Sequence, residues 1–289
     1  MRILLVDGNN YAYRGHYAVQ ELTSDDGIPT NAVRGFFNIL CADIHLLKPT
    51  HVALSFDRTP SFRRLAMYPE YKGTRDHSGA NIDPQLRIIR KLARASGFAT
   101  LGIVGEESDD VIATLTKTFE SNGFEVLISS TDKDFATLVG KNVKIVEPRT
   151  RKLIGHNGVK NKFGVSPYQM QDFLTLMGDK ADNVPGAKGV AKKTAAKLLT
   201  AYKDIRGIYE AVEAGKLTPA LSRNLEQFKR SGQLRLSYKL IKLYTKVSLN
   251  FDHDRFDLSR KKANHNLVRS ICEELNMNAT HKLLARVNR

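Results

Sequence analysis

The chain has 289 residues, of which 42% are hydrophobic, and this is enough to build a substantial folded core. Lys and Arg number 45 against 30 Asp and Glu, and the formal net charge of +15 favours a polyanionic partner. Asp7 interrupts the first apolar run after four residues, and no later run approaches the roughly 18 apolar residues of a membrane span. The composition therefore predicts a globular, cytoplasmic protein without a membrane partner.

Short β-branched runs alternate with helical patterns in the first half of the chain. The runs typical of buried parallel strands cover residues 3–6, 52–56, 126–130 and 143–146. Helical patterns cover residues 32–47, 84–95 and 110–119. This alternation predicts an α/β fold with a mostly parallel central sheet. Strand signals fade near residue 160, so we predict a first domain at 1–160 and a helical region at 161–289.

Acidic residues follow three of the predicted strands. Asp7 ends the first strand, Asp57 follows the second, and Asp132 and Asp134 follow the third. Because the carboxyl ends of parallel strands open on the same crevice, we expect these acids to converge. Carboxylates packed together raise one another's pKa unless a cation intervenes, and oxygen ligands of this type suit Mg²⁺ or Mn²⁺.

Two more acidic groups lie at helix boundaries. Glu107, Asp109 and Asp110 begin a helical pattern, and Asp179 and Asp182 precede a Pro-Gly break. Taken alone, each group is more often a set of first-turn acids, helix caps or solvated side chains. Nine such acids at the strand ends and helix starts of a strongly basic chain are harder to explain structurally. The set as a whole therefore indicates a metal site.

A basic and aromatic segment lies between the second strand and the first acidic helix. It contains Arg58, Phe62, Arg63, Arg64, Tyr68, Tyr71, Lys72, Arg75, Arg87, Arg90, Lys91 and Arg94. Aromatic side chains interleaved with cations suit a single-stranded nucleic acid, through stacking and phosphate contacts. We expect the segment, at about residues 60–98, to arch over the crevice. A solvated basic helix face with packed aromatic rings is the alternative.

A second cationic element, at residues 186–195, is a Gly-rich turn that leads into a helix. Lysines in the first turns of a helix are unfavourable against its dipole, which indicates an anionic partner. The residues expected to bind duplex phosphates are Gly186, Lys188, Gly189, Lys192, Lys193 and Thr194. An ordinary turn between two helices is the alternative.

Together, these motifs resemble the 5′-nuclease family. The family comprises bacteriophage 5′-to-3′ exonucleases, the N-terminal domain of bacterial family A DNA polymerases and, more distantly, eukaryotic flap endonucleases. The matching motifs are VDGNN at 6–10, FD at 56–57, YPEYKGTR at 68–75, ESDD at 107–110, TDKD at 131–134 and GDKADN at 178–183. The resemblance covers residues 3–199, and without a polymerase module the chain is most similar to the stand-alone phage type. It departs from the family pattern at Ser108, where Ala is usual, and at Ala191, where Gly is common.

The resemblance implies a PIN-like nuclease domain with a helical arch, followed by a helix-hairpin (helix-three-turn-helix) DNA-binding motif at about 184–200. It implies two Mg²⁺ ions, with Mn²⁺ as a substitute, and a K⁺ ion at the hairpin turn that Ala191 puts in doubt. The expected ligands of the first ion are Asp7, Asp57, Glu107, Asp109, Asp110 and Asp132, and those of the second are Asp134, Asp179 and Asp182.

The resemblance also assigns roles around the expected reaction. Lys72 would stabilise the reacting phosphate, Arg75 would steer the strand and Arg14 would contact a nearby phosphate. Tyr71 would stack on a frayed base. Arg63 and Arg64 join the expected DNA contacts.

The activity implied is that of a divalent-metal-dependent 5′-to-3′ exonuclease and 5′-flap endonuclease in replication or repair. We expect a monomer acting on DNA with 5′ ends, flaps or branches, in a bacterial or phage-infected bacterial cell. Whether RNA primers are also substrates stays open from the sequence. Two other classes stay open. A DNA-structure-binding protein with weak catalysis is disfavoured by the complete acidic set, and a ribonuclease with a similar crevice is disfavoured by the basic segment and the hairpin turn.

Overall fold

The computed structural model describes residues 1–74, 82–148 and 150–287. Its centre is a six-stranded sheet with the strand order β3-β2-β1-β4-β5-β6. The strands are β1 (Arg2–Asp7), β2 (His51–Ser55), β3 (Ala99–Leu101), β4 (Glu125–Ser129), β5 (Val143–Val146) and β6 (Leu153–Ile154). The first five are parallel, and β6 runs antiparallel to β5. The predicted mostly parallel sheet is confirmed, with β3 and β6 added to the four expected strands.

Side chains of β1 alternate between two hydrophobic clusters. Ile3 and Leu5 belong to a cluster that contains the buried face of α5 (Ser108–Ser121). Leu4 and Val6 belong to the cluster on the opposite face. All four side chains are fully buried, because successive residues of a strand point to opposite faces and both faces of this sheet are covered. The sheet is therefore the middle layer of a three-layer arrangement.

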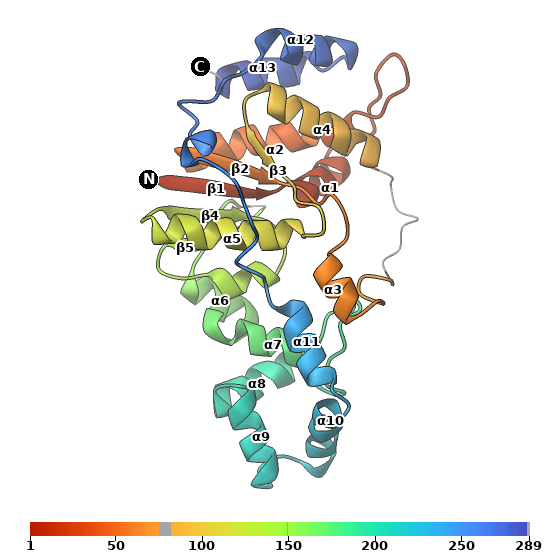
Figure 1. The fold of residues 1–289 in the computed structure, drawn as a ribbon, viewed down its shortest axis with the longest axis vertical. Coiled ribbons are helices and arrows are strands. Elements are labelled where there is room, and N and C mark those ends of the chain that lie inside the picture. The colour runs from red at the N-terminus through yellow and green to blue at the C-terminus, as the bar shows by residue number, and fades with distance from the viewer. Residues whose placement is uncertain (75–81, 149, 288–289) are drawn as a thin grey trace.

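The face reached by Leu4 and Val6 is covered by helices from both ends of the chain. These are α1 (Gly8–Ala18), α2 (Asn31–Leu47), α4 (Asp83–Ala95), α12 (His265–Glu274) and α13 (Asn278–Val287). Figure 1 shows α12 and α13 beside α2 and α4, although they are the last helices of the chain. The division near residue 160 stays a prediction, and the last two helices of the predicted C-terminal region pack against the first part of the chain.

A helical region adjoins the other face of the sheet. It contains η1 (Asp134–Leu138), α6 (His156–Phe163), η2 (Pro167–Gln169), α7 (Met170–Met177), α8 (Lys192–Tyr202), α9 (Ile205–Glu213), α10 (Pro219–Arg230) and α11 (Gln233–Ile241). The short helix α3 (Phe62–Met67) contacts α11, and η3 (His253–Phe256) lies where the chain returns past β2. Figure 1 places α8 to α10 at one end of the long axis and α12 at the other, with the sheet between them.

The predicted arch at about residues 60–98 includes α3 and α4. Its middle part, residues 75–81 with Arg75, lies outside the described residues. Within the described ranges, no helix is both long and apolar enough to cross a membrane.

Candidate active site

The carboxyl ends of β1, β2 and β4 bring Asp7, Asp57 and Asp132 to one edge of the sheet. β1 pairs with β2 on one side and with β4 on the other, so the residues that follow these strands are neighbours. Asp7 caps α1, where its Oδ1 accepts from the backbone N of Asn10 at 3.0 Å. Its Oδ2 accepts from the Ser130 hydroxyl at 2.8 Å, and the Ser130 oxygen accepts from the backbone N of Asp132 at 3.1 Å. Burial raises the pKa of Asp7 to about 6.

Helix α5 begins beside this edge. Its first turn is fixed by Asp57, whose Oδ1 accepts from the backbone N of Ser108 at 2.7 Å. The next residue of the helix, Asp109, lies close to the acids at the strand ends. Burial raises the pKa of Asp109 well above its ordinary value, and the neighbouring Asp132, Asp7 and Asp57 raise it further. Four carboxylates thus lie within electrostatic reach of one another.

Asp132 also belongs to a second acidic group. Burial raises the pKa of Asp134 well above its usual range, and Asp132, Asp179 and Asp182 raise it further. Lys133 Nζ lies 2.8 Å from Asp179 Oδ2 and offsets part of this negative charge. The structure therefore brings together two acidic groups that meet at Asp132.

Lys72 and Tyr71 border both groups on the side of the arch. Lys72 has a positive φ of 58°, and its backbone N donates to the carbonyl oxygen of Asp182 at 2.9 Å. Its Nζ lies 2.7 Å from Glu107 Oε1 and 3.9 Å from Asp182 Oδ2. The Tyr71 hydroxyl lies 3.3 Å from Glu107 Oε2 and 3.2 Å from Asp182 Oδ2. These two residues therefore join the start of α5 to the loop that carries Asp182.

Tyr71 is buried in this structure, and its stacking on a base stays a prediction. The ring is 7% exposed and packs into a hydrophobic cluster. Burial raises the pKa of the Tyr71 hydroxyl, and the carboxylates of Glu107 and Asp182 raise it further. The hydroxyl therefore stays protonated and donates to the carboxylates. Tyr71 is a positioning residue.

Arg64, a predicted DNA contact, and Asp110, a predicted metal ligand, are paired with each other in this structure, and both roles stay predictions. Arg64 Nη1 and Nη2 lie 2.5 Å and 2.9 Å from the two carboxylate oxygens of Asp110. The side chains are 4% and 0% exposed. Asp110 Oδ1 also accepts from the backbone N of Tyr244 at 2.8 Å, and Arg64 donates from Nε to the carbonyl oxygen of Leu240 at 2.8 Å. The pair therefore fastens α3 and α5 to the segment that ends α11.

Two other predicted cations, Arg63 and Arg14, differ in their surroundings. Arg63 is at the surface, where its Nη2 lies 2.7 Å from Glu106 Oε1 and its guanidinium covers the Tyr244 ring at 3.6 Å. Arg14 lines a cavity of about 360 Å³ that also borders Asp132. Arg14 Nη1 is buried and has no hydrogen-bond partner among the described residues. Arg14 Nη1 is therefore a cationic donor that is available to a ligand in the cavity beside Asp132.

The predicted hairpin turn has a packing role that the sequence did not reveal. A Cβ on Gly186 would lie 2.1 Å from the carbonyl oxygen of Met177 and 2.7 Å from the backbone N of Gly178. Gly186 is therefore required for the close approach of two backbone segments, and this accounts for it without a DNA contact.

Gly186→Ala should lower the free energy of unfolding by about 3 kcal/mol, because the new methyl group meets backbone atoms that cannot move aside. Gly155→Ala is the matched control, since a Cβ there has nothing within 4 Å, and it should cost less than about 1 kcal/mol. Urea unfolding followed by circular dichroism measures both. Equal stabilities for the two variants would contradict the packing role.

The cationic residues of the same turn differ in their surroundings. Lys188, Gly189 and Lys193 are exposed, and Thr194 is partly buried. Lys192 donates from Nζ to the carbonyl oxygen at the end of α6 at 2.7 Å. An exposed cationic surface therefore precedes and begins α8, whose first turn contains no acid.

Sequence reasoning missed two residues that hold the acids in place, Ser130 and Lys133. Ser130 joins Asp7 to the backbone of Asp132, and Lys133 pairs with Asp179 of the second acidic group. The available signal was their position, since both lie within the strand-end motif of β4. The Ser130 hydroxyl and the Lys133 ammonium were not singled out, because the neighbouring carboxylates gave the stronger signal.

The donor set fits a hard divalent cation. Burial raises the pKa values of Asp109, Asp132 and Asp134, and repulsion between neighbouring carboxylates raises them further; a bound cation would relieve that repulsion. Among the described residues, no group of three acids already stands in an arrangement that would hold a metal ion. Several oxygens instead face Lys72, Lys133 and Ser130.

Asp109→Asn should raise the stability of the protein in EDTA by about 1 kcal/mol, because it removes a carboxylate that its neighbours repel. This corresponds to a rise of a few degrees in Tm. Mg²⁺ should raise the Tm of the wild type by more than that of the variant. Differential scanning calorimetry measures both effects, and a lower Tm for the variant in EDTA would refute the repulsion.

An acidic crevice at the strand ends, bordered by cations, defines a site for metal-assisted chemistry on a phosphodiester. Comparison with known families agrees along most of the chain. Residues 2–164 match the model described as the 5′-3′ exonuclease, N-terminal resolvase-like domain. Residues 165–264 match the 5′-3′ exonuclease, C-terminal SAM fold. The chain belongs to the 5′-3′ exonuclease family.

The chain is similar in sequence to relatives of two different lengths. A 5′-3′ exonuclease of Aquifex aeolicus is 33% identical over 287 residues, which cover 99% of this chain and 96% of that protein. DNA polymerase I of Bacillus subtilis is 38% identical over 236 residues, which cover 79% of this chain and 26% of the polymerase. The chain thus spans nearly the whole of one relative and about a quarter of the other.

Solved structures share the fold at lower identity. A T5 5′-exonuclease with bound zinc ions has a TM-score of 0.69 and 19% identity, with full coverage of both chains. A T5 D15 flap endonuclease in complex with DNA and metal ions has a TM-score of 0.70 and 18% identity, and the match covers 100% of this chain and 99% of that one. The catalytic core of Rad2 with a DNA substrate has a TM-score of 0.62 and 15% identity, covering 100% of this chain and 92% of Rad2.

Proposed function

We propose that the chain is a divalent-metal-dependent 5′-to-3′ exonuclease and 5′-flap endonuclease that hydrolyses phosphodiester bonds in DNA. The observation that carries this proposal is the meeting of two acidic groups at Asp132, beside Lys72. Membership of the 5′-3′ exonuclease family supports it. So does the likeness in fold to T5 and Rad2 proteins that were solved with metal ions or DNA.

We propose two Mg²⁺ ions, with Mn²⁺ as a substitute. Asp7, Asp57, Asp109 and Asp132 would hold one, with Glu107 beside it, and Asp134, Asp179 and Asp182 would hold the other. Bound there, such ions would supply an activated water and stabilise the leaving oxygen. Oxygen-only ligands and repelling carboxylates support a hard cation in both places.

The protein's own residues orient the reaction. Lys72 Nζ, held between Glu107 and Asp182, can donate to a non-bridging oxygen of the reacting phosphate. The Tyr71 hydroxyl keeps those two carboxylates in place. Arg14 offers its buried Nη1 to a phosphate in the adjoining cavity. Arg75 lies outside the described residues, and its proposed role in steering the DNA strand rests on the sequence motif alone.

The exposed surface at the start of α8 suits the backbone of duplex DNA. Lys188 and Lys193 lie on it, and the backbone amides of a helix start are anion donors. Three further proposals rest on the sequence resemblance alone: a K⁺ ion at this turn, tolerance of RNA primers and a monomeric state. A cytoplasmic location is proposed from the composition of the sequence. The complete acidic set favours the nuclease over the DNA-binding alternative.

Three labelled substrates test the proposal: a 5′-flap DNA, a 3′-flap DNA and an RNA hairpin. With Mg²⁺ or Mn²⁺, the wild-type protein should cut the 5′ flap near the junction and leave the other two largely intact, and EDTA should stop cutting. Binding of the 5′ flap without any cutting would assign the DNA-binding alternative. Preferred cutting of the RNA hairpin would assign the ribonuclease alternative.

A further inference from the structure

A buried acid on α2, Asp43, belongs to neither acidic group of the crevice. The residue is 2% exposed. It accepts a hydrogen bond from the Tyr11 hydroxyl, and the Ser129 hydroxyl lies 3.4 Å from its Oδ2. Its Oδ1 lies 2.6 Å from Arg151 Nε. Burying a carboxylate is costly unless it is paired and hydrogen-bonded, and Asp43 meets both conditions through partners from α1, β4 and the connection between β5 and β6.

The Tyr11 contact of Asp43 leads to Arg14. Tyr11 and Arg14 are three residues apart on α1, and the Arg14 guanidinium lies over the Tyr11 ring, 5.0 Å from its centroid. Burial raises the pKa of the Tyr11 hydroxyl well above its ordinary value, and the charge of Asp43 raises it further. The hydroxyl therefore stays protonated, donates to Asp43 and fixes the ring that supports Arg14.

The Arg151 contact of Asp43 leads to Arg14 as well. Arg151 has a positive φ of 56°, and its backbone N donates to the Glu147 carbonyl oxygen at 2.8 Å, which closes the turn that contains Pro148. The Pro148 carbonyl oxygen accepts from Arg14 Nη2 at 3.2 Å. A residue other than glycine keeps a positive φ where its surroundings hold it, and the pair with Asp43 is such a constraint.

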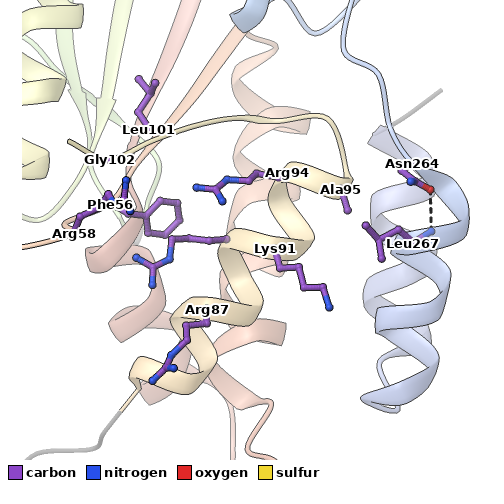
Figure 2. A pocket seen from close by; sticks show the side chains of 11 residues that line it. Phe56, Arg58, Arg87, Lys91, Arg94, Ala95, Leu101, Gly102, Asn264 and Leu267 are labelled. Carbon is purple, nitrogen blue, oxygen red and sulfur yellow. Dashed lines mark hydrogen bonds between the residues drawn. The ribbon is translucent and has the colours of Figure 1, made fainter. Parts of the chain in front are cut away.

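The orientation of Arg14 matters because acids share its cavity. The cavity has a volume of about 360 Å³, and its lining includes Asp132 and Glu147. By contrast, a cavity of about 870 Å³ between α4 and α12 is lined by five cations and, among its described residues, by no acid (Figure 2). An Arg14 side chain that lost its two supports would be free to pair with a carboxylate instead of a phosphate.

We propose that Asp43 is a positioning residue that holds Arg14 in place for a phosphate of the DNA substrate. It acts through two supports, the Tyr11 ring beneath the guanidinium and the turn that Arg151 fastens. Arg14 Nη1 is buried and has no hydrogen-bond partner among the described residues, so it is the atom left for the phosphate. This role rests on the proposed function, because the phosphate belongs to the substrate of the nuclease. Asp43 itself is too deeply buried to touch DNA.

A double-mutant cycle tests whether Asp43 acts through Arg14. It compares the wild type with Arg14→Gln, Asp43→Asn and the two changes combined. Fluorescence anisotropy in EDTA measures the Kd for a 5′-flap DNA, so that binding is scored without cleavage, and circular dichroism checks folding. Arg151→Gln, alone and with Arg14→Gln, gives a second cycle that leaves the buried acid in place. The second cycle decides the question if Asp43→Asn does not fold.

Arg14→Gln should weaken binding by about tenfold, because it removes one charge-assisted contact with a phosphate. Asp43→Asn and Arg151→Gln should each weaken binding by about fivefold, because Arg14 is present but no longer held. In the Arg14→Gln background, neither change should weaken binding by more than about 1.5-fold. The salt dependence of binding should fall by a slope of about 0.7 to 0.9 in Arg14→Gln, and in the same direction in Asp43→Asn.

Two further variants separate positioning from general damage to the fold. Arg151→Lys keeps a cation for Asp43 and should bind DNA more tightly than Arg151→Gln. Arg2→Gln is the matched control, because it breaks an ion pair with Glu125 at the amino end of β1, away from the acids. It should leave the Kd within about 1.5-fold of the wild type.

Three results would overturn the role of Asp43. The first is an unchanged Kd in Asp43→Asn and Arg151→Gln. The second is an equal loss in the wild-type and Arg14→Gln backgrounds, which would assign a general effect on the fold or a separate DNA contact. The third is an unchanged Kd in Arg14→Gln itself.

Cleavage of the same flap by the wild type in Mg²⁺ is scored separately. If the wild type binds the flap but does not cut it, the proposed nuclease function fails, while the two cycles still decide whether Asp43 positions a DNA-binding arginine. If the wild type cuts the flap and Asp43→Asn and Arg151→Gln bind it as the wild type does, only the role of Asp43 fails.

Discussion

Replacing Asp132 with asparagine should reduce the single-turnover rate of 5′-flap cleavage by about a thousandfold or more, which corresponds to about 4 kcal/mol of transition-state stabilisation. Asp132 is the residue at which the two acidic groups meet, because it raises the pKa of both Asp109 and Asp134. Its loss therefore weakens both proposed metal positions, whereas the other acids belong to one group each.

The matched control is Asp25→Asn, which makes the same chemical change on an exposed loop and should leave the rate unchanged. Quenched-flow cleavage with excess protein measures the chemical step for wild type and both variants. Asp132→Asn should still bind the flap DNA, because its effect falls on catalysis. A rate within about tenfold of the wild type would remove Asp132 from the proposed centre.

Arg64→Ala should lower the free energy of unfolding by about 3 to 5 kcal/mol, because it leaves Asp110 buried without its partner. The neighbouring Arg63→Ala removes a similar side chain that is 39% exposed and paired at the surface, and it should cost less than about 1 kcal/mol. Chemical denaturation measures the free energy of unfolding of both variants, and a large loss only for Arg64→Ala would identify Arg64 as a structural residue.

A second variant makes this prediction sharper. Arg64→Ala combined with Asp110→Ala should regain part of the lost stability, because no buried charge is left unpaired. If Arg64→Ala unfolded at the same denaturant concentration as the wild type and bound DNA more weakly, Arg64 would be a DNA contact rather than a structural residue.

The part of the site that sequence could predict is the part that depends on strand order and periodicity. Asp7, Asp57 and Asp132 follow strands whose β-branched runs are visible in the sequence, and parallel strands end at one edge. The parallel sheet itself follows from the same signals. β3 escaped prediction because its three residues are too few for a recognisable run.

The part that sequence could not predict depends on distant partners. The burial of Arg64 is set by Asp110 and by the carbonyl oxygen of Leu240, which is 176 residues away. The orientation of Tyr71 is set by Asp182, which is 111 residues away. A local basic and aromatic pattern looks the same whether its side chains face solvent or a buried carboxylate, so the sequence did not reveal that Arg64 pairs with Asp110.

The most direct test of the central claim is the Mg²⁺ dependence of 5′-flap cleavage under single-turnover conditions, for the wild type and Asp134→Asn. If the two acidic groups each hold an ion, the logarithm of the wild-type rate should rise with the logarithm of free Mg²⁺ at a slope of about two at low Mg²⁺. Asp134→Asn should be slower and need more Mg²⁺ to saturate. Cleavage of the 5′ flap by the wild type in excess EDTA, at its full rate, would contradict the account.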